Sequence, residues 1–182
     1  MSLSAHDAVA DHFRWIDGHA DVWAIFRDAE ALAVVVTALA EPFRGTGVTA
    51  VCGVESRGFL LGAAVAVELG VGFVPIRKGL GMLPGTKLAR RSAPDYRGIA
   101  HTLRLQRSSL RGEDRVVLVD DWIETGNQAA AVKEMVEQAG AGWAGCSVVI
   151  DQLTNDTHRD ILGPVISLLA AQQLPPQRKS AT

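Results

Sequence analysis

The sequence predicts an α/β fold in which a parallel sheet is flanked by helices. Three observations support this prediction: short β-branched runs alternate with helical stretches, glycines follow the helical stretches, and no repeat or long linker divides the 182 residues. We therefore expect a single domain over residues 1–182, with its core at about residues 25–170.

Five short apolar segments predict the strands. Residues 48–54 (VTAVCGV) form a β-branched run of the kind found in strands that are buried on both faces. Residues 115–120 (RVVLVD) have the same character and end on a carboxylate. The predicted strands are residues 48–54, 71–76, 115–120, 147–151 and 164–169.

Three segments predict helices. Residues 57–69 are small and apolar nearly all round, as expected for a helix packed closely on a sheet, and Gly70 follows as a stop signal. Residues 125–139 place their apolar positions on one face and end at Gly140. Residues 31–43 form the third predicted helix, despite their valines.

Two segments show no such pattern. Residues 79–98 combine prolines and glycines with Lys87, Arg90, Arg91 and Arg97, which is typical of either a basic lid over an anionic ligand or a solvated loop. Residues 174–182 lack core-forming side chains, and we expect a loose tail there.

Composition narrows the class of protein. A hydrophobic content of 48% with a formal net charge of −2 is typical of a globular protein and gives no reason to expect a nucleic-acid partner. Residues 1–13 lack the apolar region of a secretory signal, and no segment is long enough to cross a membrane. Cys52 and Cys146 lie in apolar runs, as reduced, buried cysteines do. These features predict a cytoplasmic protein.

The sharpest chemical signal is residues 116–128 (VVLVDDWIETGNQ). A buried strand delivers Asp120 and Asp121 at its carboxyl end, where ligands bind in open parallel sheets. A tight turn and a helix start follow, and such exposed amides attract phosphate. A ribose phosphate would use both features, with its diol on the carboxylates and its 5-phosphate on the amides of residues 125–128.

This run resembles the phosphoribosyl pyrophosphate (PRPP) signature of the type I phosphoribosyltransferases, and other segments are closest to the adenine phosphoribosyltransferases. Residues 70–78 (GVGFVPIRK) match a run of that family residue for residue. The remaining matching segments are residues 25–28 (IFRD), 53–59 (GVESRGF), 83–85 (LPG) and 95–96 (DY). The resemblance implies the phosphoribosyltransferase fold with a flexible lid loop and a small hood, and a purine salvage enzyme that releases pyrophosphate from PRPP.

The resemblance also assigns the PRPP site. Ser56 and Arg57 follow a strand and open a helix, so both are expected to face the pyrophosphate, and a strained peptide is implied at Glu55–Ser56. Arg77 and Lys78 end the next strand toward the same edge. The expected PRPP-binding residues are Ser56, Arg57, Arg77, Lys78, Asp120, Asp121, Glu124, Thr125, Gly126, Asn127 and Gln128. We expect Mg²⁺ to be chelated by PRPP itself, with no direct protein ligand and with Asp120 and Asp121 acting at most through water.

Catalysis would combine Arg57, which neutralises the leaving group, with a carboxylate that handles a proton. The resemblance implicates Asp95, one methylene shorter than the family's glutamate. Glu124 replaces the alanine usual in adenine enzymes, whereas hypoxanthine-guanine relatives carry an acid there. It is equally interpretable as a carboxylate favoured at a helix start.

The base pocket departs most from the family, because Val22 and Trp23 stand where Pro-Gly is usual. The expected base-binding residues are Ile25, Phe26, Arg27 and Leu153. Adenine is the first expectation for the base, with hypoxanthine, guanine or xanthine as alternatives. A non-catalytic PRPP-binding regulator is a further alternative, and the resemblance implies a homodimer.

Overall fold

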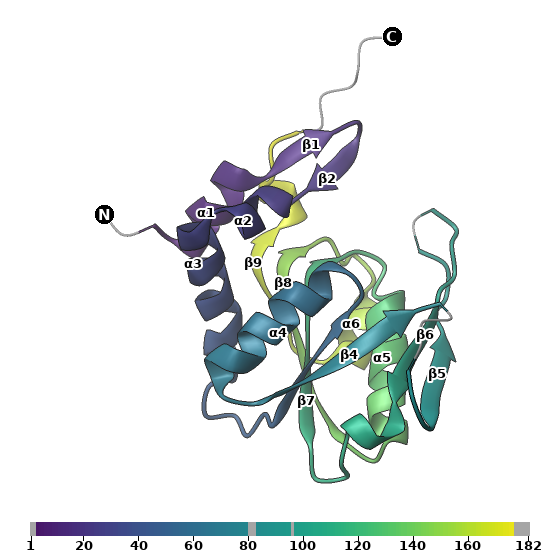
Figure 1. Cartoon of the computed structure of the whole chain (residues 1–182). Helices are drawn as coiled ribbons and strands as arrows, with labels where there is room; N and C mark the ends of the chain where they lie inside the picture. The colour runs from purple at the N-terminus through teal and green to yellow at the C-terminus, as the bar shows by residue number, and fades with distance from the viewer. Residues whose placement is uncertain (1–2, 80–82, 96, 177–182) are drawn as a thin grey trace.

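The computed structural model describes residues 3–79, 83–95 and 97–176. It confirms the α/β prediction, with a central seven-stranded sheet and helices on both faces (Figure 1). The strand order is β5 (Lys87–Arg91), β6 (Thr102–Gln106), β4 (Gly72–Lys78), β3 (Ala50–Val54), β7 (Arg115–Ile123), β8 (Gly142–Asp151) and β9 (Val165–Ala170). The strands from β4 to β9 in this order are parallel, whereas β6 is antiparallel to both of its neighbours.

Two apolar cores lie on opposite faces of the sheet. Val117 and Val119 of β7 join one core, and Val116 and Leu118 join the other, as the alternation of side chains along a strand requires. The first core is covered by α1 (Ala5–His12), α3 (Ala29–Ala40) and α4 (Arg57–Leu69), and the second by α5 (Asn127–Gln138) and α6 (Asp156–Leu162). Short 3-10 turns occupy Glu41–Phe43, Arg107–Ser109 and Ala171–Gln173.

Glycines allow α4 to lie unusually close to β3. A Cβ atom on Gly53 would lie 2.0 Å from the carbonyl oxygen of Gly58, and one on Gly62 would lie 2.7 Å from the Phe73 ring. Small residues on both elements therefore bring the start of α4 against the sheet. The predicted helix over residues 57–69 is confirmed, and it ends at Gly70, whose φ is +70°.

The hood consists of residues 14–27. In it, β1 (Arg14–Ile16) and β2 (His19–Asp21) form a hairpin, and α2 (Trp23–Arg27) follows. The turn between the strands is Asp17-Gly18, with φ of +48° and +78°. Positive φ at both central residues is the geometry of the tight hairpin turns that Asp-Gly favours. Figure 1 shows the hood above one end of the sheet, beside β9.

Several details differ from the sequence predictions. Residues 79–98, expected to lack structure, contain the edge strand β5, which pairs with the unpredicted β6. Helix α6 was also not predicted, and β7 continues to Ile123 rather than ending at Asp120. Leu174, expected in the loose tail, is 9% exposed and packs into the first core, while residues 177–182 of that tail lie outside the described residues. Cys52 and Cys146 are buried and unpaired, as expected. In the described part of the chain, no helix has the length and apolarity needed to cross a membrane.

Candidate active site

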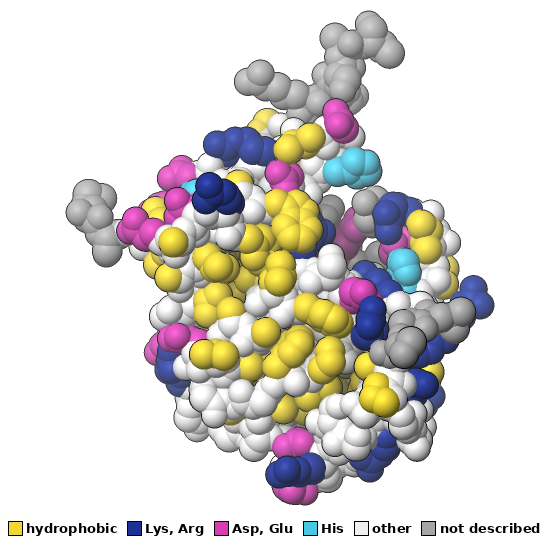
Figure 2. Space-filling model, in the orientation of Figure 1, with side chains coloured by type: hydrophobic (Ala, Val, Ile, Leu, Met, Phe, Trp, Pro, Cys, Tyr) yellow, Lys and Arg dark blue, Asp and Glu magenta, His cyan; other side chains and the backbone are white. Residues whose placement is uncertain are grey.

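A cavity of about 980 Å³ opens at the carboxyl ends of β3, β4, β7 and β8, beneath the hood. In the sheet, β3 lies between β4, the next strand in the chain, and β7. This reversal of strand order is where open α/β sheets bind ligands. Figure 2 shows the hollow between the hood and the body of the domain, with acidic and basic side chains around it.

The turn from β3 into α4 forms one wall of this cavity. Ser56 and Arg57 line it, and the Glu55–Ser56 peptide is cis. The guanidinium of Arg57 is fixed by Asp121, whose Oδ2 lies 2.9 Å from Nε. A Cβ on Gly58 would lie 2.9 Å from Oδ1 of Asp120, so the first turn of α4 rests directly on the acidic pair.

The acidic pair itself lies near the carboxyl end of β7. Strand β3 pairs with β7 only as far as Leu118, whereas β8 pairs with β7 to Ile123. Asp120 and Asp121 therefore lie beyond the part of β7 that pairs with β3, and both line the cavity. Burial, and then the neighbouring Asp121 carboxylate, raise the pKa of Asp120 well above its usual range. A second negative charge beside Asp121 is therefore unfavourable, and a cation or a hydroxyl donor in the cavity would help to keep both carboxylates ionised.

The next wall is the turn from β7 into α5. Glu124, Thr125, Gly126 and Gln128 line the cavity here. Gly126 has a φ of +77°, and a Cβ there would lie 3.1 Å from atoms of both Leu153 and His158. The turn therefore depends on a glycine, and it presents the amino end of a 12-residue helix. Free amides at such an end are suited to a phosphate.

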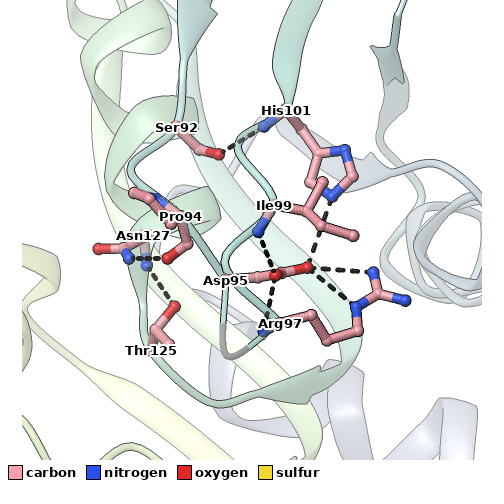
Figure 3. Close-up of polar contacts among 8 residues, drawn as sticks. All are labelled: Ser92, Pro94, Asp95, Arg97, Ile99, His101, Thr125 and Asn127. Atoms are coloured by element: carbon pink, nitrogen blue, oxygen red, sulfur yellow. Dashed lines mark hydrogen bonds and ion pairs between the residues drawn. The ribbon is translucent and has the colours of Figure 1, made fainter.

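Asp95 reaches the cavity from the loop between β5 and β6, but its carboxylate is fully engaged (Figure 3). One oxygen accepts hydrogen bonds from the amides of Arg97 and Ile99, both at 2.9 Å. The other lies 3.0 Å from the Arg97 guanidinium and 3.6 Å from the His101 ring. Burial opposes ionisation, but the Ile99 amide and the Arg97 contacts outweigh it and lower the pKa of Asp95 to about 2.

The pKa of Glu124 is shifted in the opposite direction from that of Asp95. Burial, and then the charge of Asp95, raise the pKa of Glu124 above its usual range, although Arg97 partly opposes the shift. Of the two carboxylates proposed to handle a proton, Glu124 therefore holds its proton more readily.

Two predicted PRPP ligands lie outside this cavity lining. Lys78 lines it, but the side chain of Arg77 lies 3.3 Å from the Glu55 carboxylate. Asn127 donates from its side chain to the carbonyl of Pro94 at 2.7 Å, which ties the loop of Asp95 to the start of α5 (Figure 3). It borders a smaller cavity of about 470 Å³ on the other side of Thr125. Of the four basic residues of the segment expected to be a lid or a loop, Arg97 lines the main cavity, whereas Lys87, Arg90 and Arg91 are on β5, outside its lining.

The four expected base-binding residues also lie outside the lining of the main cavity. Ile25 and Leu153 are 1% and 4% exposed, and Arg27 points to solvent as an exposed residue. The Phe26 ring lies 5.5 Å from that of Trp23. Base binding by these four residues stays a prediction.

Sequence reasoning did not assign the aromatic wall of the cavity. Trp15, Trp23 and Trp122 line it, and Trp122 also donates from Nε1 to Gln152 at 2.9 Å and packs near Phe13. A signal was available for the hairpin of the hood, because the Asp17-Gly18 dipeptide is typical of tight hairpin turns. Nothing in the sequence alone would have placed Gln152.

The charge of the cavity favours a ligand that brings a cation. Among the described residues, its lining holds three cations and seven carboxylates; the cations are Arg57, Lys78 and Arg97, and the carboxylates are Asp17, Asp21, Glu55, Asp95, Asp120, Asp121 and Glu124. The described residues contain no group of three or more His, Cys, Asp or Glu side chains placed to bind a metal by themselves. A polyanion that carries its own cation would therefore be bound more favourably than a bare one.

Comparisons with known proteins agree with this chemistry. Residues 22–162 match the phosphoribosyl transferase domain family. The chain is 38% identical over 179 residues to the adenine phosphoribosyltransferase of Frankia casuarinae, covering 91% of this chain and 93% of that one. It is 43% identical over 131 residues to the enzyme of that name from Streptomyces clavuligerus, covering 72% of each. The crystal structure of the Giardia lamblia enzyme complexed with 9-deazaadenine matches with a TM-score of 0.83 at 29% identity, over 92% of this chain and 98% of that one.

Proposed function

Because the chain belongs to the phosphoribosyl transferase domain family, we propose that it is an adenine phosphoribosyltransferase acting in purine salvage. It joins adenine to the ribose 5-phosphate of PRPP and releases pyrophosphate. One observation carries the proposal: the acidic pair of β7, the glycine turn and the start of α5 meet Arg57 in one cavity. Neither a plain strand end nor a solvated aspartate pair would require that arrangement.

PRPP would span this cavity from one helix start to the other. Its 5-phosphate would take the amides of Thr125, Gly126 and the following residues, and its ribose diol would take Asp120 and Asp121. Its pyrophosphate would face Ser56, Arg57 and Lys78. Arg77 and Asn127, held by Glu55 and Pro94, would shape these walls instead of touching the ligand.

The reaction breaks the bond from the anomeric carbon to pyrophosphate and forms one to a ring nitrogen of adenine, which loses its proton. Negative charge grows on the departing oxygen, and Arg57 and Lys78 are the cations on that side of the cavity. The hood and the Asp95 loop would exclude water that could otherwise hydrolyse PRPP.

The residues present fit Mg²⁺ that arrives chelated by PRPP. Mg²⁺ keeps several waters and takes few protein ligands, which suits two carboxylates of which one already binds Arg57. Asp120 and Asp121 would meet the cation through water. When bound, Mg²⁺ supplies positive charge that neutralises the pyrophosphate leaving group.

We propose that Glu124, rather than Asp95, accepts the proton that adenine loses. Each Asp95 oxygen already has partners, and a carboxyl with a pKa of about 2 is a weak base. Glu124 carries a raised pKa and faces the cavity. Asp95 would instead hold the shape of its loop through Arg97 and Ile99.

The Glu124 assignment is tested by the pH dependence of kcat/KM for adenine. As proton acceptor, Glu124 must be ionised, so activity should fall as the pH drops through its raised pKa. Glu124→Gln should lower the rate by about 10²- to 10⁴-fold and flatten that acid limb. Asp95→Asn should keep the limb but move it to lower pH, because the charge of Asp95 helps to raise the pKa of Glu124. An acid limb that survives in Glu124→Gln would refute the assignment.

We further propose a cytoplasmic homodimer. Unpaired buried cysteines support a reducing compartment. Leu60 and Val67 on α4 are 50% and 81% exposed, and Figure 2 shows hydrophobic side chains gathered on the face that α4 occupies. Sedimentation of the purified chain as a monomer would refute the dimer.

The proposed activity is tested by incubating the protein with adenine, PRPP and Mg²⁺ and measuring the AMP formed by chromatography. Arg57→Ala should abolish most of the product, whereas Arg111→Ala, which removes an exposed cation elsewhere, should not. Equal loss in both variants, or no product from the wild-type chain, would count against the proposal.

A further inference from the structure

The Arg57 guanidinium is held from two directions. Its Nε lies 2.9 Å from Oδ2 of Asp121, which is almost completely buried. Its Cζ lies 5.7 Å from the centre of the Trp23 ring, within the range of a cation–π contact. The two partners come from different parts of the fold, because Asp121 belongs to β7 and Trp23 to the hood.

Trp23 is placed for this contact although it is poorly buried. Its backbone amide donates to Oδ1 of Asp21 at 2.9 Å, and its ring packs 5.5 Å from that of Phe26. About half of Trp23 remains exposed, at 49%, and it lines the main cavity. Burial of apolar surface alone therefore does not account for a tryptophan here.

We propose that Trp23 is a positioning residue that holds Arg57 for the pyrophosphate of PRPP; this inference rests on the proposed function. Asp121 alone fixes one edge of the guanidinium and partly neutralises its charge. A ring over the flat face adds a second restraint without adding a negative charge, and it leaves the in-plane N–H groups available as donors. The hood would thereby be coupled to the leaving-group end of the site.

The test is the affinity for PRPP with Mg²⁺, measured by calorimetry, in Trp23→Leu and Trp23→Phe. Trp23→Leu keeps an apolar side chain without a π-face and should weaken PRPP binding by about 2- to 5-fold, as expected for a partly exposed cation–π contact. Trp23→Phe keeps a weaker π-face and should recover part of the loss. Ile161→Ala, which shortens a comparably exposed side chain at 45% on α6, should leave the affinity unchanged.

A double-mutant cycle separates positioning from general damage to the hood. In an Arg57→Ala background, Trp23→Leu should have no further effect on PRPP affinity. Additive losses, equal losses in the Leu and Phe variants, or a change confined to the KM for adenine would each overturn the proposal. Binding does not require turnover, so a chain that binds PRPP without releasing pyrophosphate would refute the proposed enzyme while still testing Trp23. A wild-type chain that fails to bind PRPP would overturn both.

Discussion

Replacing Gly53 by alanine should destabilise the protein strongly, because this position has no room for a methyl group. The added Cβ would lie 2.0 Å from the carbonyl oxygen of Gly58 and 2.6 Å from its carbonyl carbon, both of which are backbone atoms. An ordinary contact is at least about 3.4 Å, so α4 must move away from β3 by more than about 1 Å. Overpacking of this kind costs about 1–3 kcal/mol, and we expect the upper end because no flexible side chain can yield. In a chain of this size, about 3 kcal/mol corresponds to a fall in Tm of roughly 6–12 °C.

The assay is urea unfolding, combined with PRPP affinity, for Gly53→Ala and Gly72→Ala. Gly72 lies on the neighbouring strand β4, and a Cβ there would meet no atom within 4 Å. Gly72→Ala should therefore be neutral or slightly stabilising. The movement of α4 in Gly53→Ala would also shift Arg57, so PRPP affinity should fall in the folded variant. A change in unfolding free energy below about 0.5 kcal/mol for Gly53→Ala would refute the packing argument.

Three further predictions concern stability and reactivity. The folded pKa of Asp95, about 2, lies below its usual value of 3.8, so its stabilisation is present above pH 3.8 and is lost as the pH falls toward 2. The difference in unfolding free energy between wild type and Asp95→Asn should thus be about 1 kcal/mol smaller at pH 3 than at pH 6. A difference that does not change with pH would contradict this prediction. Ser147→Ala removes the buried hydrogen bond, 2.8 Å long, to the carbonyl of Leu39 and should cost about 1–3 kcal/mol in chemical denaturation, whereas an unchanged midpoint would argue against it. Burial raises the pKa of Cys146 to about 12 and that of Cys52 well above its usual range, so a thiol reagent at pH 8 should modify neither until the chain unfolds.

The sequence predicts the body of this fold well because its elements carry strong local signals. The helix over residues 57–69 has a glycine stop and a composition that only close packing on a sheet explains. The strand that carries Asp120 and Asp121 has a continuous apolar run, residues 116–119, immediately before them. The resemblance implies a small hood, but its hairpin was not located in the sequence because its strands are three residues long, too short for a periodic pattern.

The same contrast divides the candidate site. Adjacent residues such as Glu124, Thr125 and Gly126 could be placed together from the sequence, since one turn carries them. Pairings between distant segments could not be foreseen. Arg77 is held by Glu55 because β3 and β4 run side by side in register, and this removes it from the cavity wall. The sequence likewise shows Asp95 only as a carboxylate in a loop, and the structure is needed to show that the amides of Arg97 and Ile99 donate to it.

Pyrophosphate release from PRPP and Mg²⁺, with adenine, hypoxanthine, guanine or xanthine added in turn, tests both the proposed enzyme and its substrate. We expect release that depends on adenine and is far weaker with the other bases. Release that depends on hypoxanthine, guanine or xanthine instead would contradict adenine as the substrate, but it would still support phosphoribosyl transfer. PRPP that binds tightly while no base triggers release would contradict the enzyme and favour a PRPP-binding regulator.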